Sequence, residues 1–342
     1  MSDEIVFSRQ GCAGLVTLSR PDALNALTRG MCVELHRQLD AWAVDDAVRV
    51  VVVTGAGDKA FCAGGDVVGL YRAGKAGSAD WEGFFADEYR MNLAIGRYPK
   101  PYVALIDGVT MGGGVGISIH TPYRVATERT LFAMPETGIG LVPDVGGTHA
   151  LSHMPGEIGT FLGLTGARLK AADCLYAGVA THHLPSASRA GIIDALADGG
   201  AVDAVLAAAH VDPGPPPLAG RRADIDRYFA ADSVEAIMAA LSMGDEWAEA
   251  QRDHLMKMSP TSMKLTLRAL REGRGDDLAG CLVREYRLVS AIKSGHDFFE
   301  GVRAQLIDKD RKPIWRPAAL RDVTEDIVDA HFSAPVWGDL SF

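Results

Sequence analysis

Two carboxylates stand eight residues apart in an apolar segment and could divide acid–base work between them. Glu136 and Asp144 each directly follow a proline within Met134–Gly147 (MPETGIGLVPDVGG). A carboxyl group among apolar neighbours has a raised pKa, and a like charge nearby raises it further. Such a pair can supply a base or nucleophile and an acid. The spacing alone equally allows structural roles, with Glu136 capping a turn and Asp144 capping the next helix.

Two glycine-bearing segments could present backbone N–H groups to a ligand oxygen. Ala60–Asp66 (AFCAGGD) follows the β-branched run Val48–Thr54, and Met111–Gly116 (MGGGVG) follows the apolar run Tyr102–Ile106. Glycine lets a backbone approach a ligand closely. When N–H groups of two loops converge on one oxygen, they form an oxyanion hole, where losing one donor costs about 10²–10³ in rate. The same glycines could instead serve only turns and tight packing. Neither segment matches G-x-G-x-x-G, because Ile117 takes the last position, so a dinucleotide site is not indicated.

Other catalytic centres are not indicated. The sequence has no G-x-S-x-G elbow, which disfavours an α/β-hydrolase triad. Its ten histidines show no H-E-x-x-H spacing and its five cysteines form no C-x-x-C pair, so we predict neither a metal site nor a disulfide framework. Scattered cysteines fit a reducing compartment, and we expect a cytoplasmic location.

Short strands and helices alternate around these segments. Runs of β-branched and apolar residues predict strands at Glu4–Arg9, Gly14–Ser19, Val48–Thr54, Tyr102–Ile106, Tyr123–Ala126 and Thr130–Ala133. Helical periodicity predicts helices at Met31–Trp42 (with Thr28 as N-cap), Trp81–Arg97, Glu157–Leu164 and Ala171–Ala177. Met111–His120 is predicted to be a turn that feeds a helix. This order indicates an α/β or α+β chain.

A proline-rich segment divides the chain. Val211–Gly220 has four prolines in ten residues and predicts a stiff, extended linker. We expect residues 1–210 to form the core and residues 221–342 a helical C-terminal region. The helices expected there are Val234–Leu241, Glu246–Met256, Pro260–Glu272 and Asp277–Ser294.

Composition and charge exclude some partners. The 342 residues are 48% apolar and carry a formal net charge of −10. An acidic chain repels phosphate backbones, so we expect no nucleic-acid partner. The sequence contains no apolar stretch of the roughly 20 residues that a membrane span requires, and the acidic start at Met1–Glu4 predicts no secretory signal. We therefore expect no membrane partner.

Several segments together resemble the crotonase superfamily. They are Pro21–Leu27 (PDALNAL), Ala60–Asp66, Lys100–Gly116 and Pro135–Gly147. The resemblance implies a spiral of ββα turns that binds acyl-CoA and holds the thioester oxyanion on two backbone N–H groups. The residues at the motif positions of these two N–H donors are Gly65 and Gly113. The residues that it places against CoA are Asn25, Ala26, Ala63 and Gly64.

The acidic residues indicate which group within this superfamily the sequence resembles most. Hydratases of this family usually carry one glutamate just after the triple glycine, where this chain has Gly116, and a second at the position of Glu136. With Asp144 added, the pattern is most similar to the 3-hydroxyisobutyryl-CoA hydrolases. The likeness continues through Ser259–Ser262, Glu285–Leu288, Gly295–Ala304 and Leu306–Asp310, and so covers nearly the whole chain. It also implies a substrate contact at Glu88, which could equally be a solvated helix charge.

The implied activity is hydrolysis of a short-chain 3-hydroxyacyl-CoA in valine breakdown. Glu136 either attacks the thioester or activates water, and Asp144 positions a hydroxyl group or water. No metal or redox cofactor is expected, since coenzyme A is part of the substrate. The alternatives are an enoyl-CoA hydratase or isomerase and, from another class, a non-catalytic acyl-CoA-binding protein. Crotonase relatives are often trimers or hexamers, and a monomer also stays open.

Overall fold

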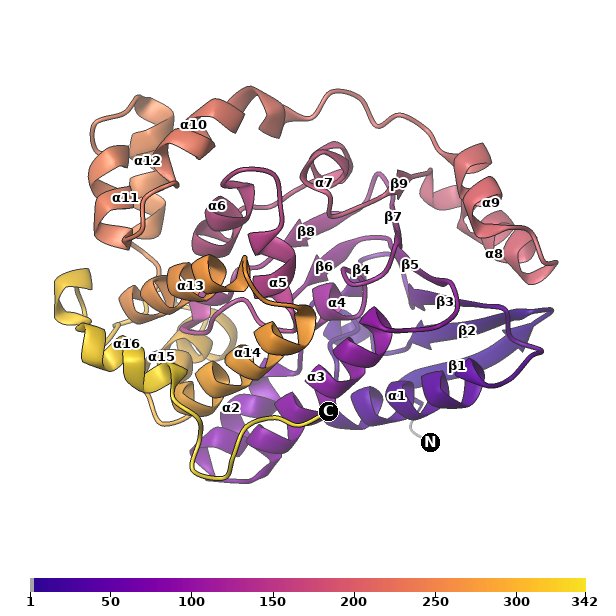
Figure 1. Ribbon diagram of the computed structural model, residues 1–342, viewed down its shortest axis with the longest axis horizontal. Coiled ribbons are helices and arrows are strands. Elements are labelled where there is room, and N and C mark those ends of the chain that lie inside the picture. Colours follow the sequence, from indigo (N-terminus) through magenta and orange to yellow (C-terminus); the bar gives the residue numbers. More distant parts are fainter. Residues whose placement is uncertain (1–2) are drawn as a thin grey trace. The chain divides into compact units, whose positions relative to one another are not determined.

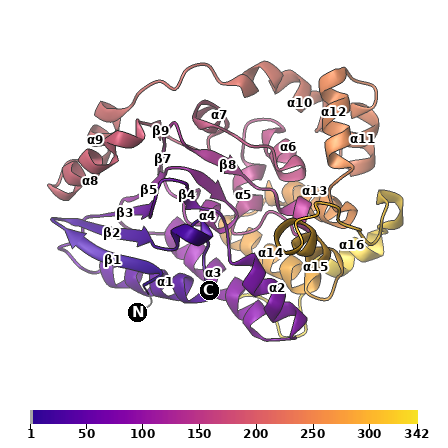
Figure 2. The same ribbon diagram turned by 180° about the vertical axis from the view of Figure 1, so that it is seen from behind.

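Strands that alternate between two sheets form the first part of the chain in the computed structural model, which describes residues 3–342 (Figures 1 and 2). The larger sheet has the order β1-β2-β3-β5-β7-β9, and the smaller has the order β4-β6-β8. The strands of the larger sheet are β1 (Ile5–Gln10), β2 (Ala13–Leu18), β3 (Val50–Gly55), β5 (Tyr102–Ile106), β7 (Tyr123–Ala126) and β9 (His182–His183). Those of the smaller sheet are β4 (Ala60–Cys62), β6 (Val109–Met111) and β8 (Leu131–Ala133). The chain thus passes from β3 to β4, from β5 to β6 and from β7 to β8, which confirms the expected spiral of ββα turns.

Packing groups the chain into two units, each assembled from three segments. One contains Met1–Gly65, Asp87–Ala133 and Arg168–Gly220, and the other contains Asp66–Ala86, Met134–Ala167 and Arg221–Phe342. The division expected from the sequence, into 1–210, 211–220 and 221–342, stays a prediction.

Helices cover both faces of the larger sheet in the first unit. Only β1 and β2 pair antiparallel, and the remaining strands are parallel. Helix α1 (Arg29–Ala43) covers one face, where the Trp42 ring occupies the space beside Gly14. On the other face, α8 (Arg189–Ala197) and α9 (Val202–Ala209) pack on the sheet, as Figures 1 and 2 both show. This double cover explains why β3 is a continuous apolar run.

The remaining helices of the first unit are short. They are α4 (Gly113–Gly116), α7 (Ala171–Ala177) and the 3-10 turns at Pro21–Ala23 and Ser186–Ser188. Helix α3 (Asp80–Gly96) passes from one unit to the other. The predicted helix through Met111–His120 is wrong in length, because glycine is a poor helix former and α4 spans only four residues. Tyr102 Oη instead donates to the carbonyl of Ile117, at 3.0 Å, where the helix ends.

The second unit is almost entirely helical. Its helices are α2 (Val67–Lys75), α5 (Gly147–Ser152), α6 (Ile158–Thr165), α10 (Arg222–Tyr228), α11 (Val234–Leu241), α12 (Glu246–Leu255), α13 (Pro260–Gly273), α14 (Leu278–Ile292), α15 (Asp297–Val302) and α16 (Glu325–Phe332). The 3-10 helices are η2 (Glu136–Ile139), η4 (Pro217–Arg221, at the boundary between the units) and η6 (Leu320–Asp322), and η5 (Arg303–Ile307) is a π-helix.

Side-chain caps fix where the long helices begin. Ser259 caps α13 and Asp277 caps α14, each accepting from a backbone N–H three residues later, at 3.1 and 2.8 Å. An N-cap of this kind contributes about 1 kcal/mol. An aromatic cluster joins α2, α3 and α15 within the unit, with the Trp81 and Phe298 ring centroids 4.8 Å apart.

Candidate functional site

The two glycine loops converge in the first unit. They follow β4 and β6, which are adjacent parallel strands, so both leave the sheet at the same edge. A methyl group on Gly113 would lie 3.3 Å from the carbonyl carbon of Gly64, which adopts a φ of +124° that favours glycine. Gly113 is the first residue of α4, so its N–H has no acceptor within that helix. The two loops therefore lie in contact, and the assignment of the Gly65 and Gly113 N–H groups as the oxyanion hole stays a prediction.

Glu88 lies against the second of these loops. Its side chain extends from α3 and is 2% exposed, and its Oε1 atom is 2.7 Å from where a Cβ of Gly113 would lie. The alternative of a solvated helix charge is therefore wrong. Burial, with a contribution from Glu88, raises the pKa of the nearby Cys62 thiol to about 12, so this cysteine is not a thiolate nucleophile.

The residues predicted to contact CoA lie together beside the first glycine loop. Asn25 is fully buried, and its amide accepts from the Arg20 N–H at 3.0 Å and donates to the carbonyls of Ala56 and Ala60 at 2.9 and 2.8 Å. The backbone on either side bonds to the loop that follows β4. Those bonds run from Leu27 N–H to Gly64 O and from Ala63 N–H to Leu24 O, at 2.8 and 3.0 Å, and Ala26 lies between them. Asn25 thus shapes this segment from inside through three side-chain hydrogen bonds, two of which use both N–H donors of its amide.

The two predicted catalytic carboxylates are buried near one another in the second unit. Glu136 begins η2, and Glu136 and Asp144 are each 4% exposed. Burial, and secondly the charge of Asp144, raise the pKa of Glu136 well above its usual range. Among the described residues, Glu136 Oε2 has no hydrogen-bond partner. A carboxyl group held in this way is suited to base or nucleophile chemistry.

Neither carboxylate stands at the N-cap position of the helix beside it. Pro135 precedes η2 without a side-chain bond, and Gly146 rather than Asp144 is the N-cap of α5. Neighbouring groups fix the turn instead, because Thr137 Oγ1 donates to Leu164 O at 3.0 Å and the Ser259 N–H donates to Thr137 O at 3.1 Å. Glu136 and Asp144 therefore do not occupy the N-cap positions of η2 and α5.

Sequence reasoning missed a third acidic group of this site and a buried amide. Glu285 of α14 is fully buried and interacts electrostatically with Glu136 and Asp144. It stands at helical spacing with the buried Cys281 and Leu288, and a carboxylate on such an apolar face was the signal that could have revealed it. Asn92 follows Glu88 by one turn of α3, is fully buried, and has no hydrogen-bond partner for its amide among residues 3–342.

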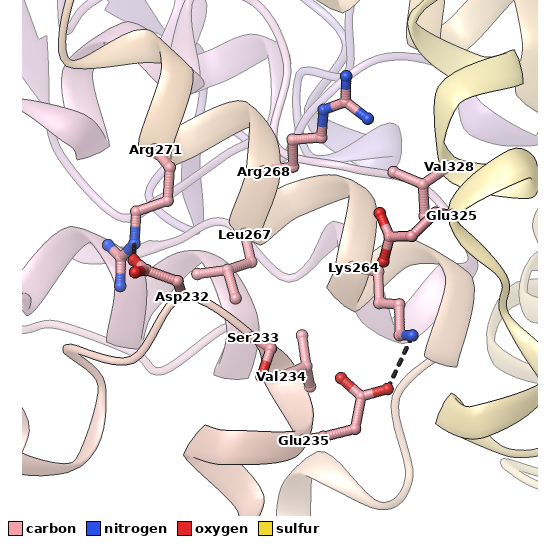
Figure 3. A pocket seen from close by; sticks show the side chains of 10 residues that line it. All are labelled: Asp232, Ser233, Val234, Glu235, Lys264, Leu267, Arg268, Arg271, Glu325 and Val328. Atoms are coloured by element: carbon pink, nitrogen blue, oxygen red, sulfur yellow. Dashed lines mark ion pairs between the residues drawn. The ribbon is translucent and has the colours of Figure 1, made fainter.

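A separate cavity of about 270 Å³ lies among α11, α13 and α16 of the second unit. Figure 3 shows Lys264, Arg268 and Arg271 along one side of α13, with Lys264 pointing toward Glu235. Each of these cations is paired, with N–O distances of 2.7 Å to Glu235, 2.5 Å to Asp329 and 2.8 Å to Glu157 respectively. The cavity therefore has no excess positive charge for an anionic ligand.

The structure shows neither a metal-binding cluster nor a membrane-spanning helix within residues 3–342. No group of three or more His, Cys, Asp or Glu side chains in that range could hold a metal ion, and the cysteines are free. Within the same range, none of the helices combines the length and apolarity needed to cross a bilayer.

Comparison with known proteins agrees with the motifs. Residues 13–332 match the model of the enoyl-CoA hydratase/isomerase family. A relative from Danio rerio, named 3-hydroxyisobutyryl-CoA hydrolase, mitochondrial, is 48% identical over 97% of this chain and 90% of its own length. The Homo sapiens protein of the same name is 45% identical over 100% of this chain and 91% of its own length.

Solved structures show the same fold. A protein from Mycobacterium thermoresistibile described as a carnitinyl-CoA dehydratase is 44% identical with a TM-score of 0.95, covering 100% of this chain and 99% of that one. An enoyl-CoA hydratase from Rhodobacter sphaeroides 2.4.1 is 39% identical with a TM-score of 0.92, covering 99% of this chain and 100% of that one.

The expectation of a cytoplasmic location is wrong by this comparison, since the Danio rerio and Homo sapiens relatives are named as mitochondrial proteins. Free cysteines indicate a reducing compartment but do not identify which one.

The convergent glycine loops, the alternation between two sheets and the match over residues 13–332 lead to one conclusion: this chain belongs to the enoyl-CoA hydratase/isomerase family and has the crotonase fold.

Proposed function

We propose that this chain hydrolyses 3-hydroxyisobutyryl-CoA to 3-hydroxyisobutyrate and CoA, a step of valine breakdown. The observation that carries the proposal is the buried Glu136, which lies close enough to Asp144 for the aspartate charge to raise its pKa and which keeps one oxygen without a partner among the described residues. The names of relatives that are 45–48% identical over nearly the full chain support the same substrate.

In the proposed mechanism, the thioester oxygen accepts hydrogen bonds from the N–H groups of Gly65 and Gly113. Glu136 either attacks the carbonyl carbon or removes a proton from an attacking water. In the first version a C–O bond forms, the C–S bond breaks with its electron pair leaving on the CoA sulfur, and water then cleaves the mixed anhydride. Asp144 positions the substrate hydroxyl or the water and assists proton transfer. Glu88, beside Gly113, contacts the acyl group.

The reaction so written needs no metal or redox cofactor, because coenzyme A arrives as part of the substrate. CoA contacts are assigned to the segment shaped by Asn25, with Ala26, Ala63 and Gly64. A pocket built for this acyl group discriminates weakly against 3-hydroxypropionyl-CoA, since one methyl group is worth about 1–3 kcal/mol.

A hydratase is the second candidate, because the two similar solved structures are described as a dehydratase and a hydratase. Gly116 argues against it. This residue ends α4 and is buried, and it offers no carboxylate at the position where hydratases of the family carry their first glutamate. A double-bond isomerase, which needs a single base, is the closer variant of this candidate.

The decisive experiment measures free thiol released from 3-hydroxyisobutyryl-CoA beside hydration of crotonyl-CoA, for wild type and Glu136→Gln. Rapid thiol release that collapses in the variant, with negligible crotonyl-CoA turnover, supports the hydrolase. Hydration without thiol release overturns it. Glu157→Gln is a matched control, because Glu157 is a partly buried glutamate of the same unit that pairs with Arg271 and Arg274, at 2.8 and 2.7 Å.

A second measurement separates the two versions of the mechanism. A single turnover in ¹⁸O-labelled water places label in the Glu136 carboxyl group only if this side chain forms the anhydride, because water then attacks the enzyme's acyl carbon in a fraction of the events. Label found only in the released acid means that water attacked the substrate's acyl carbon, as it does in the general-base version.

A further inference from the structure

The turn that carries Asp144 has an unfavourable backbone. Val145 has a φ of +56° and Gly146 a φ of +77°, so two consecutive residues are left-handed. A β-branched residue is a clear outlier in this region. The Gly147 N–H donates to Asp144 O at 2.6 Å and closes the turn. Something outside the turn must stabilise this shape.

The Glu285 carboxyl group accepts hydrogen bonds from this turn. Its Oε2 accepts from the Gly146 N–H at 2.7 Å, and its Oε1 accepts from the Thr148 N–H at 3.0 Å and the Thr148 hydroxyl at 2.5 Å. Neighbouring backbone N–H groups in a turn form a concave site for an acceptor group. Here that site is filled by a side chain of the same unit, which is fully buried on α14.

We propose that Glu285 is a positioning residue: its three hydrogen bonds hold the strained turn at Val145 and so fix the backbone from which Asp144 acts. This inference rests on the proposed function only for the role of Asp144. Its structural part, that one carboxyl group holds the turn, stands on the three contacts alone. The helix that carries Glu285, α14, is itself capped by Asp277, which accepts from the Gly280 N–H at 2.8 Å.

The closing experiment compares three variants with wild type. In Glu285→Gln, an amide NH₂ must face either the Gly146 N–H or the Thr148 donors, so at least one donor loses its acceptor. We expect kcat to fall about 10²-fold with KM nearly unchanged. Thr148→Val removes one of the three bonds and leaves both N–H contacts, so its loss should be about tenfold at most.

The third variant tests the strain directly. Glycine adopts a positive φ without steric cost, so adding Val145→Gly to Glu285→Gln should restore part of the lost kcat. A side chain that took part in the chemistry itself would not be rescued in this way. Wild-type kcat in Glu285→Gln, or a double variant no better than the single one, would overturn the proposal.

A readout without substrate separates this inference from the proposed function. Hydrogen exchange of the Gly146 and Thr148 amides should accelerate in Glu285→Gln while α13 and α6 stay protected. Exchange that accelerates across the whole unit, or not at all, rejects the positioning role. If wild type releases no thiol, the proposed function fails, and the exchange experiment still decides whether Glu285 holds the turn.

Discussion

Ser259 Oγ donates a 2.6 Å hydrogen bond to Asp297 Oδ2, and the Ser259 N–H donates to Thr137 O, the residue next to Glu136. The other carboxylate oxygen of Asp297 accepts from the Arg316 N–H at 2.7 Å. One buried aspartate therefore links the C-terminal segment to the start of α13 and, through it, to the turn that carries Glu136.

Asp297→Ala should break this link. Two donors would lose their acceptor, and the loss at the buried Ser259 hydroxyl costs about 1–3 kcal/mol. We expect a lower free energy of unfolding in urea and a moderate decrease in kcat, because the η2 turn loses its support through Ser259. An unchanged unfolding midpoint would contradict the role of this aspartate.

Gly113→Ala should damage the first unit's loops. The added methyl group would lie 2.7 Å from Glu88 Oε1 and 3.3 Å from the carbonyl carbon of Gly64, so either the buried Glu88 side chain or the N–H of residue 113 must move. Loss of one oxyanion donor costs about 10²–10³ in kcat. Gly30→Ala in α1 is the matched control, since its methyl group would meet only Thr28 Oγ1, at 3.8 Å. That variant should retain full activity and gain stability of about 0.5–1 kcal/mol.

Asp144→Asn should shift the pH profile of thiol release. The charge of Asp144 is the second cause of the raised pKa of Glu136, after burial. Removing this charge lowers that pKa, so the ionised form of Glu136 appears at lower pH. The acidic limb of kcat/KM should therefore move to lower pH, while kcat itself falls. A limb that stays in place, or moves upward, would show that Glu136 is not the group that titrates.

Stability should also depend on pH through Glu285. Burial raises its pKa to about 8, although its bonds to Thr148 and Gly146 oppose the shift. The titratable groups that interact with it are Asp144, Glu136 and the Cys281 thiol. The folded state then binds a proton more tightly than the unfolded state, so this contribution is complete below about pH 4.5 and is lost as the pH rises toward 8, by at most about 1.4 kcal/mol per pH unit. Thermal unfolding of Glu285→Gln between pH 5 and 8 should have a flatter pH dependence than wild type. Equal slopes would argue against a raised pKa.

The parts of the fold and site that could be predicted from the sequence are those that local residue patterns determine. The strands Tyr102–Ile106 and Tyr123–Ala126 and the helices Ala171–Ala177 and Val234–Leu241 have the predicted bounds, because period and flanking residues determine them locally. Glu136 and Asp144 were found because both stand within one short segment. The spiral of ββα turns was predicted from family motifs, because no repeat in the sequence reveals it.

Long-range packing explains what could not be predicted. Glu285 meets Gly146 and Thr148 from a distant helix, and no local pattern records that partner. The burial of Glu88 depends on the loop around Gly113, which the periodicity of α3 does not contain. Helix α15 was missed because it is short, although its Gly301 packs so tightly on η2 that a Cβ would lie 2.4 Å from the carbonyl carbon of Ile139.

The amide of Asn25 satisfies three backbone groups, which are the N–H of Arg20 in its own loop and the carbonyls of Ala56 and Ala60. A loop tied in this way has given up its conformational freedom during folding, so a ligand that lies along it meets a surface already in its final shape and loses little affinity to ordering. The loop then recognises the ligand through the shape of its backbone rather than through exposed side chains. Substitutions should accordingly be tolerated at the exposed Asp22 and Ala23. They should be tolerated rarely at the buried Asn25.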